Sequence, residues 1–329
     1  MKALFYTGTR QLDYRDAPDP DARANESIVR VAASGICGSD MHAWHGHDAR
    51  RVPPMILGHE LAGTVEDGPL AGRRVAVNPL VGCGACRDCV AGRPNLCVGR
   101  DLLGLGRAGG YATRIRVPTA NLMPIEDGLE DVHASLMEPL AVVLHALALA
   151  DAALARPVAE CRTLVIGGGA IGVLTALALT QRGAHEVVVA ETSAVRRDTL
   201  ARIGCGSTVD PIHGTLPDDD RFELVVDAVG SGPTRRLASR LARRGGVIVH
   251  VGLQDNEPGL DTRRLTLAEI AFLGSYTYAP PDLQAALDLL TRGALGSLDW
   301  VERRALAEGA RAFEDIDAGR ASPKIVLLP

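Results

Sequence analysis

The sequence has almost no lysine and few aromatic residues. Lys2 and Lys324 are the only lysines among 329 residues, and phenylalanine, tryptophan and tyrosine together make up 3% of the chain. The positive charge therefore comes almost entirely from arginine, and the formal net charge is −5. Because proteins that bind nucleic acid usually present a basic surface, this charge balance argues against a nucleic-acid partner.

Features of a disordered or fibrous protein are also missing. The chain has no low-complexity segment, no linker-like run and no obvious internal repeat. Hydrophobic residues make up 47% of it and charged residues 23%. A chain of this length and composition is expected to form two globular domains.

We expect neither a membrane span nor a signal peptide. Residues 132–150 and 163–181 contain no lysine, arginine or aspartate, but the first stretch contains Glu138 and Pro139, and three consecutive glycines interrupt the second. At the N-terminus the apolar patch covers only residues 3–6, which is too short for a signal-peptide core. The sequence therefore predicts a cytoplasmic protein with no membrane partner.

Four of the seven cysteines lie close together in the sequence, at Cys83, Cys86, Cys89 and Cys97. In a reducing compartment, clustered cysteines more often bind metal than form disulfides. Four thiolates in a short loop complete a tetrahedral zinc shell and leave no position for water, so we predict a structural zinc site. A zinc-ribbon binding module is the non-enzymatic alternative.

Two other cysteines, Cys161 and Cys205, have no partner spacing. We predict that they are ordinary apolar packing residues.

From residue 163 onward, β-like and helical segments alternate. We predict strands at residues 163–166, 186–190, 222–228, 247–251 and 270–273, with helices over residues 170–181 and 194–203. Strict alternation is typical of a parallel sheet that is covered on both faces by helices. Residues 140–278 are therefore predicted to form one α/β domain.

The preceding part of the chain has short β-like runs separated by glycine and proline, at residues 27–31, 62–65, 74–77 and 111–117. This pattern predicts an irregular, barrel-like β-rich domain. After residue 280 we predict one helix, 283–291, and one final strand, 324–328. The pattern alone does not assign this tail to either domain.

A glycine-rich turn joins the first predicted strand of the α/β domain to its helix. Gly167, Gly169 and Gly172 fit the pattern G-x-G-x-x-G, in which backbone N–H groups approach a pyrophosphate at a helix N-terminus. The structural alternative is a tight turn without a ligand.

Glu191 ends the second predicted strand, at the place where a carboxylate meets the adenine-side ribose of a dinucleotide. Its charge repels a 2′-phosphate and favours NAD over NADP. Arg196 and Arg197 follow closely in the sequence. They leave NADP as the alternative cofactor, because an arginine there accommodates the 2′-phosphate.

A second candidate metal site is spread over the N-terminal part. Cys37, His59 with the adjacent Glu60, and Glu138 are each unremarkable alone, but a carboxylate in the apolar run around Glu138 must be paired, protonated or bound to metal. Cysteine, histidine and glutamate together form a catalytic zinc site with a fourth position open. Asp40 is suited to orient the His59 imidazole.

Taken together, these motifs resemble the zinc-dependent medium-chain alcohol dehydrogenases. They are, in order, Cys37-Gly38-Ser39-Asp40-x-His42, Gly58-His59-Glu60, the four-cysteine loop, Glu138-Pro139-Leu140 and Gly167 to Gly172. The resemblance covers essentially the whole chain and is greatest to the polyol, sugar-acid and threonine dehydrogenase branch. It implies a GroES-like catalytic domain from residues 1–139 and 279–329, an inserted Rossmann NAD-binding domain over residues 140–278, and a homodimer or homotetramer.

The resemblance also implies roles for individual residues. Cys37 and His59 would bind the catalytic zinc together with either Glu60 or Glu138. The resemblance does not decide between the two glutamates. Ser39 and His42 match the proton relay of the family. The positions that match NAD contacts are Ile171, Glu191, Arg196, Val251, Gly252 and Leu253.

The expected reaction follows from this chemistry. Zinc lowers the pKa of a bound secondary alcohol, Ser39 accepts the hydroxyl proton and passes it through the nicotinamide ribose toward His42, and the substrate carbon gives its hydride to NAD. The alternatives are NADP-dependent reduction of small ketones or aldehydes on the same fold, and a zinc- and nucleotide-binding protein without catalysis.

The sequence departs from the family pattern in two respects. The chain is shorter than most relatives, and Thr277 stands where polyol-type members often have an arginine, which weakens the case for a polyol substrate. His45 and His47 follow the relay and are expected to be exposed loop residues, with a pocket-lining role alongside Trp44 as the alternative.

Overall fold

The structure is a computed structural model that describes all 329 residues. The chain forms two compact units: Met1–Glu138 with Tyr278–Pro329, and Pro139–Thr277. Each boundary lies one residue before the position expected from the sequence. The C-terminal segment therefore belongs to the same unit as the N-terminal part.

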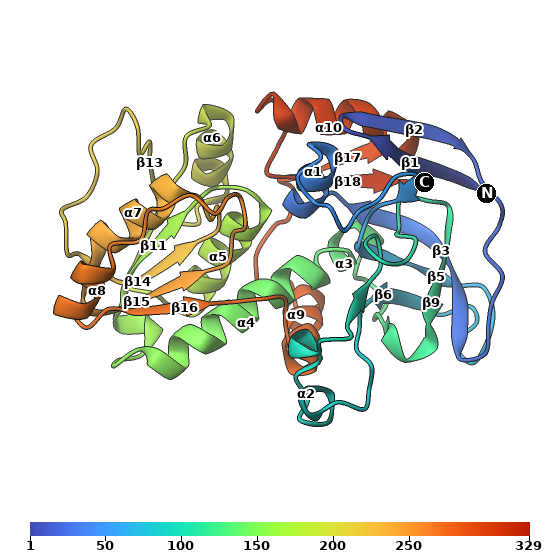
Figure 1. The fold of residues 1–329 in the computed structure, drawn as a ribbon, viewed down its shortest axis with the longest axis horizontal. Helices are drawn as coiled ribbons and strands as arrows, with labels where there is room; N and C mark the ends of the chain where they lie inside the picture. Colours follow the sequence, from blue (N-terminus) through green and yellow to red (C-terminus); the bar gives the residue numbers. More distant parts are fainter. The chain divides into compact units, whose positions relative to one another are not determined.

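The second unit contains a six-stranded sheet in which every neighbouring pair is parallel (Figure 1). Its spatial order is β13 (Ser207–Val209), β12 (Glu186–Ala190), β11 (Arg162–Ile166), β14 (Phe222–Asp227), β15 (Ala242–His250) and β16 (Ala271–Gly274). Numbered along the chain, this is the order 3-2-1-4-5-6 of a doubly wound dinucleotide-binding fold. The predicted fold class of this unit is confirmed.

Five helices accompany this sheet in the sequence. They are α4 (Met137–Ala153), α5 (Ala170–Gln181), α6 (Ala194–Ile203), α7 (Gly232–Leu241) and α8 (Thr262–Leu267), with a 3-10 turn, η3 (Val158–Glu160). Helices α5 and α6 and strand β12 have the predicted bounds. Strand β15 begins at Ala242, before the predicted start at residue 247. The prediction missed these first residues because Arg-Arg-Gly-Gly has no apolar pattern.

Every residue of β14 is buried, including Glu223 and Asp227. Burial alone would raise the pKa of Glu223, but hydrogen bonds from Arg162 lower it to about 2. Asp227 accepts the N–H groups of Val229 and Gly230 at 3.1 and 2.9 Å. Both charges are thus compensated inside the unit, as buried carboxylates require.

The helical segment Asp131–Ala153 is long and apolar enough to cross a bilayer, and 72% of its most apolar window is buried inside the protein. Burial of this kind is the behaviour of a core helix. It agrees with the sequence-based rejection of a membrane span at residues 132–150.

The first unit contains three sheets. The largest has the order β10 (Leu122–Pro124), β6 (Arg74–Val77), β5 (Glu60–Val65), β3 (Glu26–Gly35), β18 (Lys324–Leu328) and β17 (Val301–Ala305), and β9 (Arg114–Pro118) also pairs with β3. The others are β2 (Gln11–Asp16), β1 (Lys2–Gly8) and β4 (Met55–Ile56), and the pair β7 (Leu80–Val81) and β8 (Asp101–Leu102). Figure 1 shows β18, in red at the end of the chain, among the blue strands of the N-terminal part.

Strand β9 begins at Arg114, later than the predicted residue 111. The N–H groups of Gly109, Gly110 and Tyr111 donate to the carbonyl groups of residues 56–58 and not to β3, the strand with which β9 pairs. These three residues therefore form a close backbone contact with residues 56–58 before strand β9 begins.

The helices of this unit are short. They are α1 (Gly38–Trp44), α2 (Arg87–Val90), α3 (Asp131–Ala134), α9 (Pro280–Thr291) and α10 (Gly309–Asp317), with the 3-10 turns η1 (Pro94–Leu96), η2 (Thr119–Asn121) and η4 (Leu306–Glu308). Helix α9 begins at residue 280, not 283, because two prolines occupy its first turn and Asp282 accepts the Ala279 N–H at 2.8 Å. Strand β18 has the predicted bounds.

Candidate active site

The four-cysteine loop brings its sulfur atoms together. All four Sγ atoms of Cys83, Cys86, Cys89 and Cys97 lie within 4.8 Å of one another. The Cys86 N–H donates to Cys83 Sγ at 3.4 Å, and the Cys89 N–H donates to Cys86 Sγ at 3.5 Å. Hydrogen bonds from the backbone of Ala85 and Cys86 lower the pKa of the Cys83 thiol to about 6. The donor set and the backbone support for thiolates both fit a tetrahedral zinc ion.

The second candidate metal site is built by the pairing of β3 with β5. In this antiparallel pair Gly35 lies opposite Glu60, so the end of β3 and the start of β5 meet. Cys37 caps helix α1 just after β3, and His59 immediately precedes β5. The donor atoms of Cys37, His59 and Glu60 consequently lie within 4.8 Å of one another.

Asp40 connects Cys37 and His59. Its Oδ1 lies 3.5 Å from His59 Nδ1, and its Oδ2 accepts the Cys37 N–H at 3.1 Å. The fully buried Tyr111 donates its hydroxyl to the same Oδ2 at 2.6 Å. Because Asp40 faces Nδ1, the Nε2 atom of His59 is left for a metal ion.

Two buried glutamates lie at this cluster, and their surroundings differ. Glu60 belongs to the set of donor atoms within 4.8 Å, and Glu138 does not. Glu60 is 1% exposed and pairs with Lys324, which is itself fully buried and donates to the Ile36 carbonyl at 2.9 Å. A Cβ atom on Gly35 would overlap the Glu60 carboxylate, so a larger residue there would displace this side chain. Glu138 is 6% exposed, and none of the hydrogen bonds and ion pairs of the protein involves it.

Burial raises the pKa values of two groups at this cluster. Burial raises the pKa of Glu138 to about 8. Burial, with the nearby Glu60 and Asp40, raises the pKa of Cys37 to about 11. A divalent cation at this place would favour the ionised forms of both groups, so the residues fit a metal ion.

The two residues predicted to form a proton relay lie on α1. Ser39 Oγ is 3.5 Å from His59 Nε2, which places the hydroxyl beside the metal cluster. His42 lies one turn later on the same helix, and burial lowers its pKa.

Of the residues after the relay, only His47 is exposed as expected. His47 is exposed, whereas His45 is half-buried and its Nε2 lies 2.7 Å from Asp317 Oδ1. Trp44 is 3% exposed and packs in a core cluster with Phe313.

In the second unit, the glycine turn has the close packing that the motif requires. A Cβ atom on Gly172 would overlap the Gly167 carbonyl oxygen, and Gly167 has a positive φ of 99°. Glu191 lies against this turn: its Oε2 accepts the Gly168 N–H and its Oε1 accepts the Ser193 N–H, both at 2.6 Å. The carboxylate is thus held at the end of β12, beside the N-terminus of α5.

The two arginines near Glu191 behave differently. Arg197 donates to the Glu191 carbonyl at 2.7 Å and pairs with Asp210 at 3.2 Å, so it is engaged by the protein. Arg196 lies 3.9 Å from Glu191 Oε2, and its buried Nε has no hydrogen-bond partner.

The third predicted cofactor segment follows β15 at the same carboxyl edge of the sheet. The N–H groups of Val251 and Gly252 both donate to the Asp227 carbonyl at 3.0 Å, and the Leu253 side chain is 67% exposed. The predicted cofactor residues of this unit therefore gather at the edge where doubly wound sheets bind their ligands.

Comparison with known proteins identifies the family. Residues 23–127 match the alcohol dehydrogenase GroES-like domain, and residues 170–292 match the zinc-binding dehydrogenase family. L-galactonate-5-dehydrogenase of Escherichia coli K12 is 31% identical over 308 residues, which cover 90% of this chain and 88% of that protein. The chain belongs to the zinc-dependent medium-chain alcohol dehydrogenases. The family and the fold predicted from the sequence are confirmed.

Other similar proteins agree with this assignment. L-threonine 3-dehydrogenase of Rhizobium etli is 29% identical to this dehydrogenase, over 84% of this chain and 83% of the relative. A zinc-binding dehydrogenase of Sinorhizobium meliloti bound to NADP is 29% identical, with a TM-score of 0.86 over 100% of this chain and 99% of its own. An alcohol dehydrogenase of E. coli complexed with NADH is 25% identical, with a TM-score of 0.89 and the same coverage.

Three residues of the dehydrogenase that contact the metal cluster were not predicted: Arg51, Tyr111 and Lys324. Lys324 had a usable signal, since it is one of two lysines and begins an apolar strand. Arg51 and Tyr111 lie in irregular segments and have no such signal.

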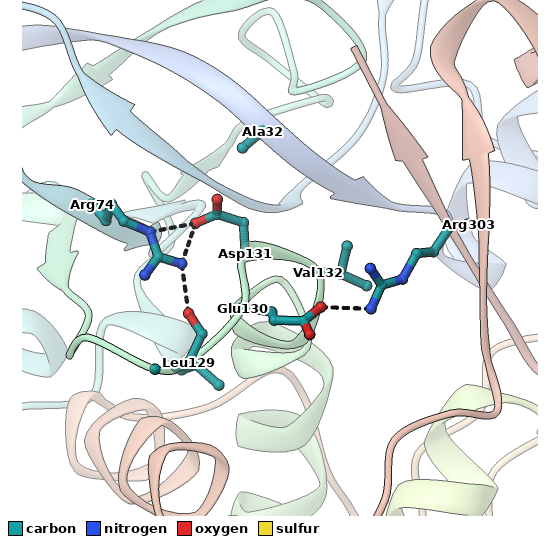
Figure 2. Close-up of a pocket in the computed structure, with 8 residues that line it drawn as sticks. Ala32, Arg74, Leu129, Glu130, Asp131, Val132 and Arg303 are labelled. Carbon is teal, nitrogen blue, oxygen red and sulfur yellow. Dashed lines mark hydrogen bonds and ion pairs between the residues drawn. The ribbon is translucent and has the colours of Figure 1, made fainter.

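One cavity of the dehydrogenase, about 420 Å³ in volume, lies apart from these residues (Figure 2). Its charged side chains pair with one another: Arg74 donates to Asp131 at 2.8 Å, and Arg303 donates to Glu130 at 2.6 Å. None of the predicted site residues lines it. The cavity therefore has no part in the site described above.

Proposed function

We propose that this dehydrogenase uses zinc and NAD to oxidise a secondary alcohol of the sugar-acid or polyol class to the ketone. The main support is the cluster of Cys37, His59 and Glu60 donor atoms within 4.8 Å, with the unpaired Glu138 beside it. When bound, zinc would supply Lewis acidity and NAD would accept the hydride. The four-cysteine loop would hold a second, structural zinc ion.

The residues around the cluster have separate tasks in this proposal. Cys37 and His59 hold the metal, and Asp40 fixes the imidazole with Nε2 toward it. Glu138 is the third protein ligand, because it is the buried carboxylate without a cationic partner. Glu60 stays close by, bound to Lys324.

Ser39 and His42 would move the proton of the alcohol. Ser39 Oγ accepts it beside His59, and His42 passes it on toward solvent. They are three residues apart on α1 and so lie on the same face of the helix. Burial lowers the pKa of His42, which keeps its imidazole neutral and able to accept a proton at neutral pH.

The proposed preference for NAD rests on Glu191. Its carboxylate is held beside the glycine turn by two main-chain N–H groups, where its charge would repel the 2′-phosphate of NADP. A second candidate, NADP-dependent reduction of a ketone or aldehyde, is favoured by the unpartnered Nε of Arg196.

The proposed substrate class comes from the relatives. Besides the L-galactonate-5-dehydrogenase, a 2-dehydro-3-deoxy-L-galactonate 5-dehydrogenase of Pseudoalteromonas atlantica is 29% identical over 96% of this chain. Both names describe oxidation at carbon 5 of a sugar acid. We therefore place a sugar acid with a secondary hydroxyl group first among the substrates.

A substrate panel combined with metal analysis tests the proposal. We expect two zinc ions per chain, and reduction of NAD at least about tenfold faster than NADP with one or more sugar acids. Cys37→Ser should retain one zinc ion and lose activity. One zinc ion per chain with no reduction of either cofactor would contradict the proposal, and faster reduction of NADP would favour the second candidate.

A further inference from the structure

Arg51 is a buried arginine next to the proposed proton relay. It is 4% exposed and lies in the segment between α1 and β4. Its Nη1 donates to the Ser39 carbonyl at 2.8 Å, and its Nη2 donates to Ser39 Oγ at 3.3 Å. Its Nε donates to the Gly104 carbonyl at 3.0 Å. The guanidinium group thus contacts both the main chain and the side chain of Ser39.

Two carboxylates of the protein balance the charge of Arg51. Asp48 Oδ2 lies 3.1 Å from Nη1, and Asp40 Oδ1 lies 3.6 Å from Nη2. Because arginine remains protonated in proteins, Arg51 is a permanent donor that cannot itself accept the proton of a substrate.

The contact with Oγ restricts what the Ser39 hydroxyl can do. A serine hydroxyl has one proton and two lone pairs, and Arg51 occupies one lone pair. The remaining lone pair can accept one proton, and the hydroxyl's own proton must point elsewhere.

We propose that Arg51 is a positioning residue for proton transfer: it holds Ser39 so that its free lone pair faces the substrate hydroxyl. This inference rests on the function proposed above. In the transfer, the alcohol O–H bond breaks and a new O–H bond forms at Ser39 Oγ. The original Ser39 proton leaves toward His42, the next acceptor in the proposed relay, so Ser39 ends with the charge it had at the start.

A double-mutant cycle separates this role from a general structural one. Arg51→Met should lower kcat about 10- to 100-fold, with the KM for the cofactor within about twofold and two zinc ions retained. Ser39→Ala should lower kcat at least as much. The double variant should be no slower than Ser39→Ala, because Arg51 acts only through Ser39.

Arg50→Met is the matched control. Arg50 is the adjacent, exposed arginine, and it also binds Asp48, through Nε at 2.8 Å and Nη2 at 3.0 Å. Because its side chain is exposed and is bound to Asp48, kcat should remain unchanged.

A crystal structure of Arg51→Met gives a readout that does not depend on activity. We expect the Ser39 side chain in a different rotamer, or in several, with Cys37 and His59 in place. If the Met variant does not fold, Arg51→Lys weakens the contact with Ser39 directly, and Asp48→Asn removes a charge that holds Arg51 in place. Both variants should give smaller losses of kcat.

Three results would overturn the inference: an unchanged Ser39 rotamer, a double variant slower than Ser39→Ala by the full effect of Arg51→Met, or loss of zinc from the Arg51 variants. Failure of the proposed function would be recognised separately, since the wild-type protein would then reduce neither cofactor.

Discussion

Glu60 and Glu138 have the same side chain but opposite surroundings. Glu60 pairs with Lys324 inside the protein, whereas Glu138 has no partner and burial raises its pKa to about 8. A buried ion pair needs no further charge, but an unpaired buried carboxylate is stable as an anion only beside a cation. This difference is the physical reason for our proposal that Glu138, and not Glu60, binds the catalytic zinc.

The matched substitutions Glu138→Gln and Glu60→Gln should therefore have different effects. We expect Glu138→Gln to weaken zinc binding at the catalytic site more than about 100-fold, because a neutral amide is a poor zinc ligand. Glu60→Gln should change zinc affinity less than about tenfold. It should lower the free energy of unfolding by roughly 3–5 kcal/mol, because Lys324 becomes a buried charge without a partner.

Chelator competition measures the first effect, and denaturant unfolding measures the second. The assignment of the third ligand would be reversed if Glu60→Gln lost zinc and Glu138→Gln kept it.

The residues of the metal cluster could be predicted only in part. Cys37, Asp40 and His59 stand in short motifs whose spacing is visible in the sequence. Tyr111 and Lys324 reach the cluster across separations of 71 and 264 residues, to Asp40 and Glu60 respectively. The periodicity of the sequence cannot predict contacts between residues so far apart, because these contacts depend on how the strands pair.

Among the secondary-structure elements, those with a clear apolar pattern and a defined start were predicted well. Helix α5 starts directly after the glycine turn, and its bounds match the prediction. Strand β17 was not predicted because it contains Glu302, Arg303 and Arg304. It lies at an edge of its sheet, where charged side chains are typical and remove the apolar signal.

The turn between β11 and α5 should determine the choice of cofactor through Glu191. Glu191→Gln removes the negative charge and keeps an oxygen that can accept the Gly168 N–H. We expect the ratio of NADP to NAD reduction, as kcat/KM, to rise about tenfold or more, because repulsion of the 2′-phosphate is lost.

Glu186→Gln is the control for that experiment. Glu186 begins the same strand, β12, and pairs with Arg221 at 2.9 Å. Its substitution should leave the cofactor ratio unchanged. An unchanged ratio in Glu191→Gln would mean that Glu191 does not contact the cofactor.

At the scale of the whole molecule, the first unit is assembled from the two ends of the chain. Strand β18 lies between β3 and β17, so the main sheet of this unit is incomplete without the C-terminal segment. The sequence predicted a strand at residues 324–328 but could not assign it to a domain, because an apolar strand fits the interior of either sheet. The resemblance to the family supplied that assignment.

This organisation predicts different behaviour for fragments of the chain. The fragment 139–277 contains the whole six-stranded sheet and its core cluster, so it should unfold in one cooperative transition when produced alone. The fragment 1–138 lacks β18, and with it the neighbour of β3 and the Lys324 partner of Glu60. We expect it to be unfolded or aggregated, because β3 becomes an exposed edge and Glu60 a buried unpaired charge.

Adding residues 278–329 to the fragment 1–138 through a flexible linker should restore folding and the binding of two zinc ions, as measured by circular dichroism and metal analysis. Cooperative folding of 1–138 alone, with two bound zinc ions, would show that the C-terminal strand is dispensable for the metal sites.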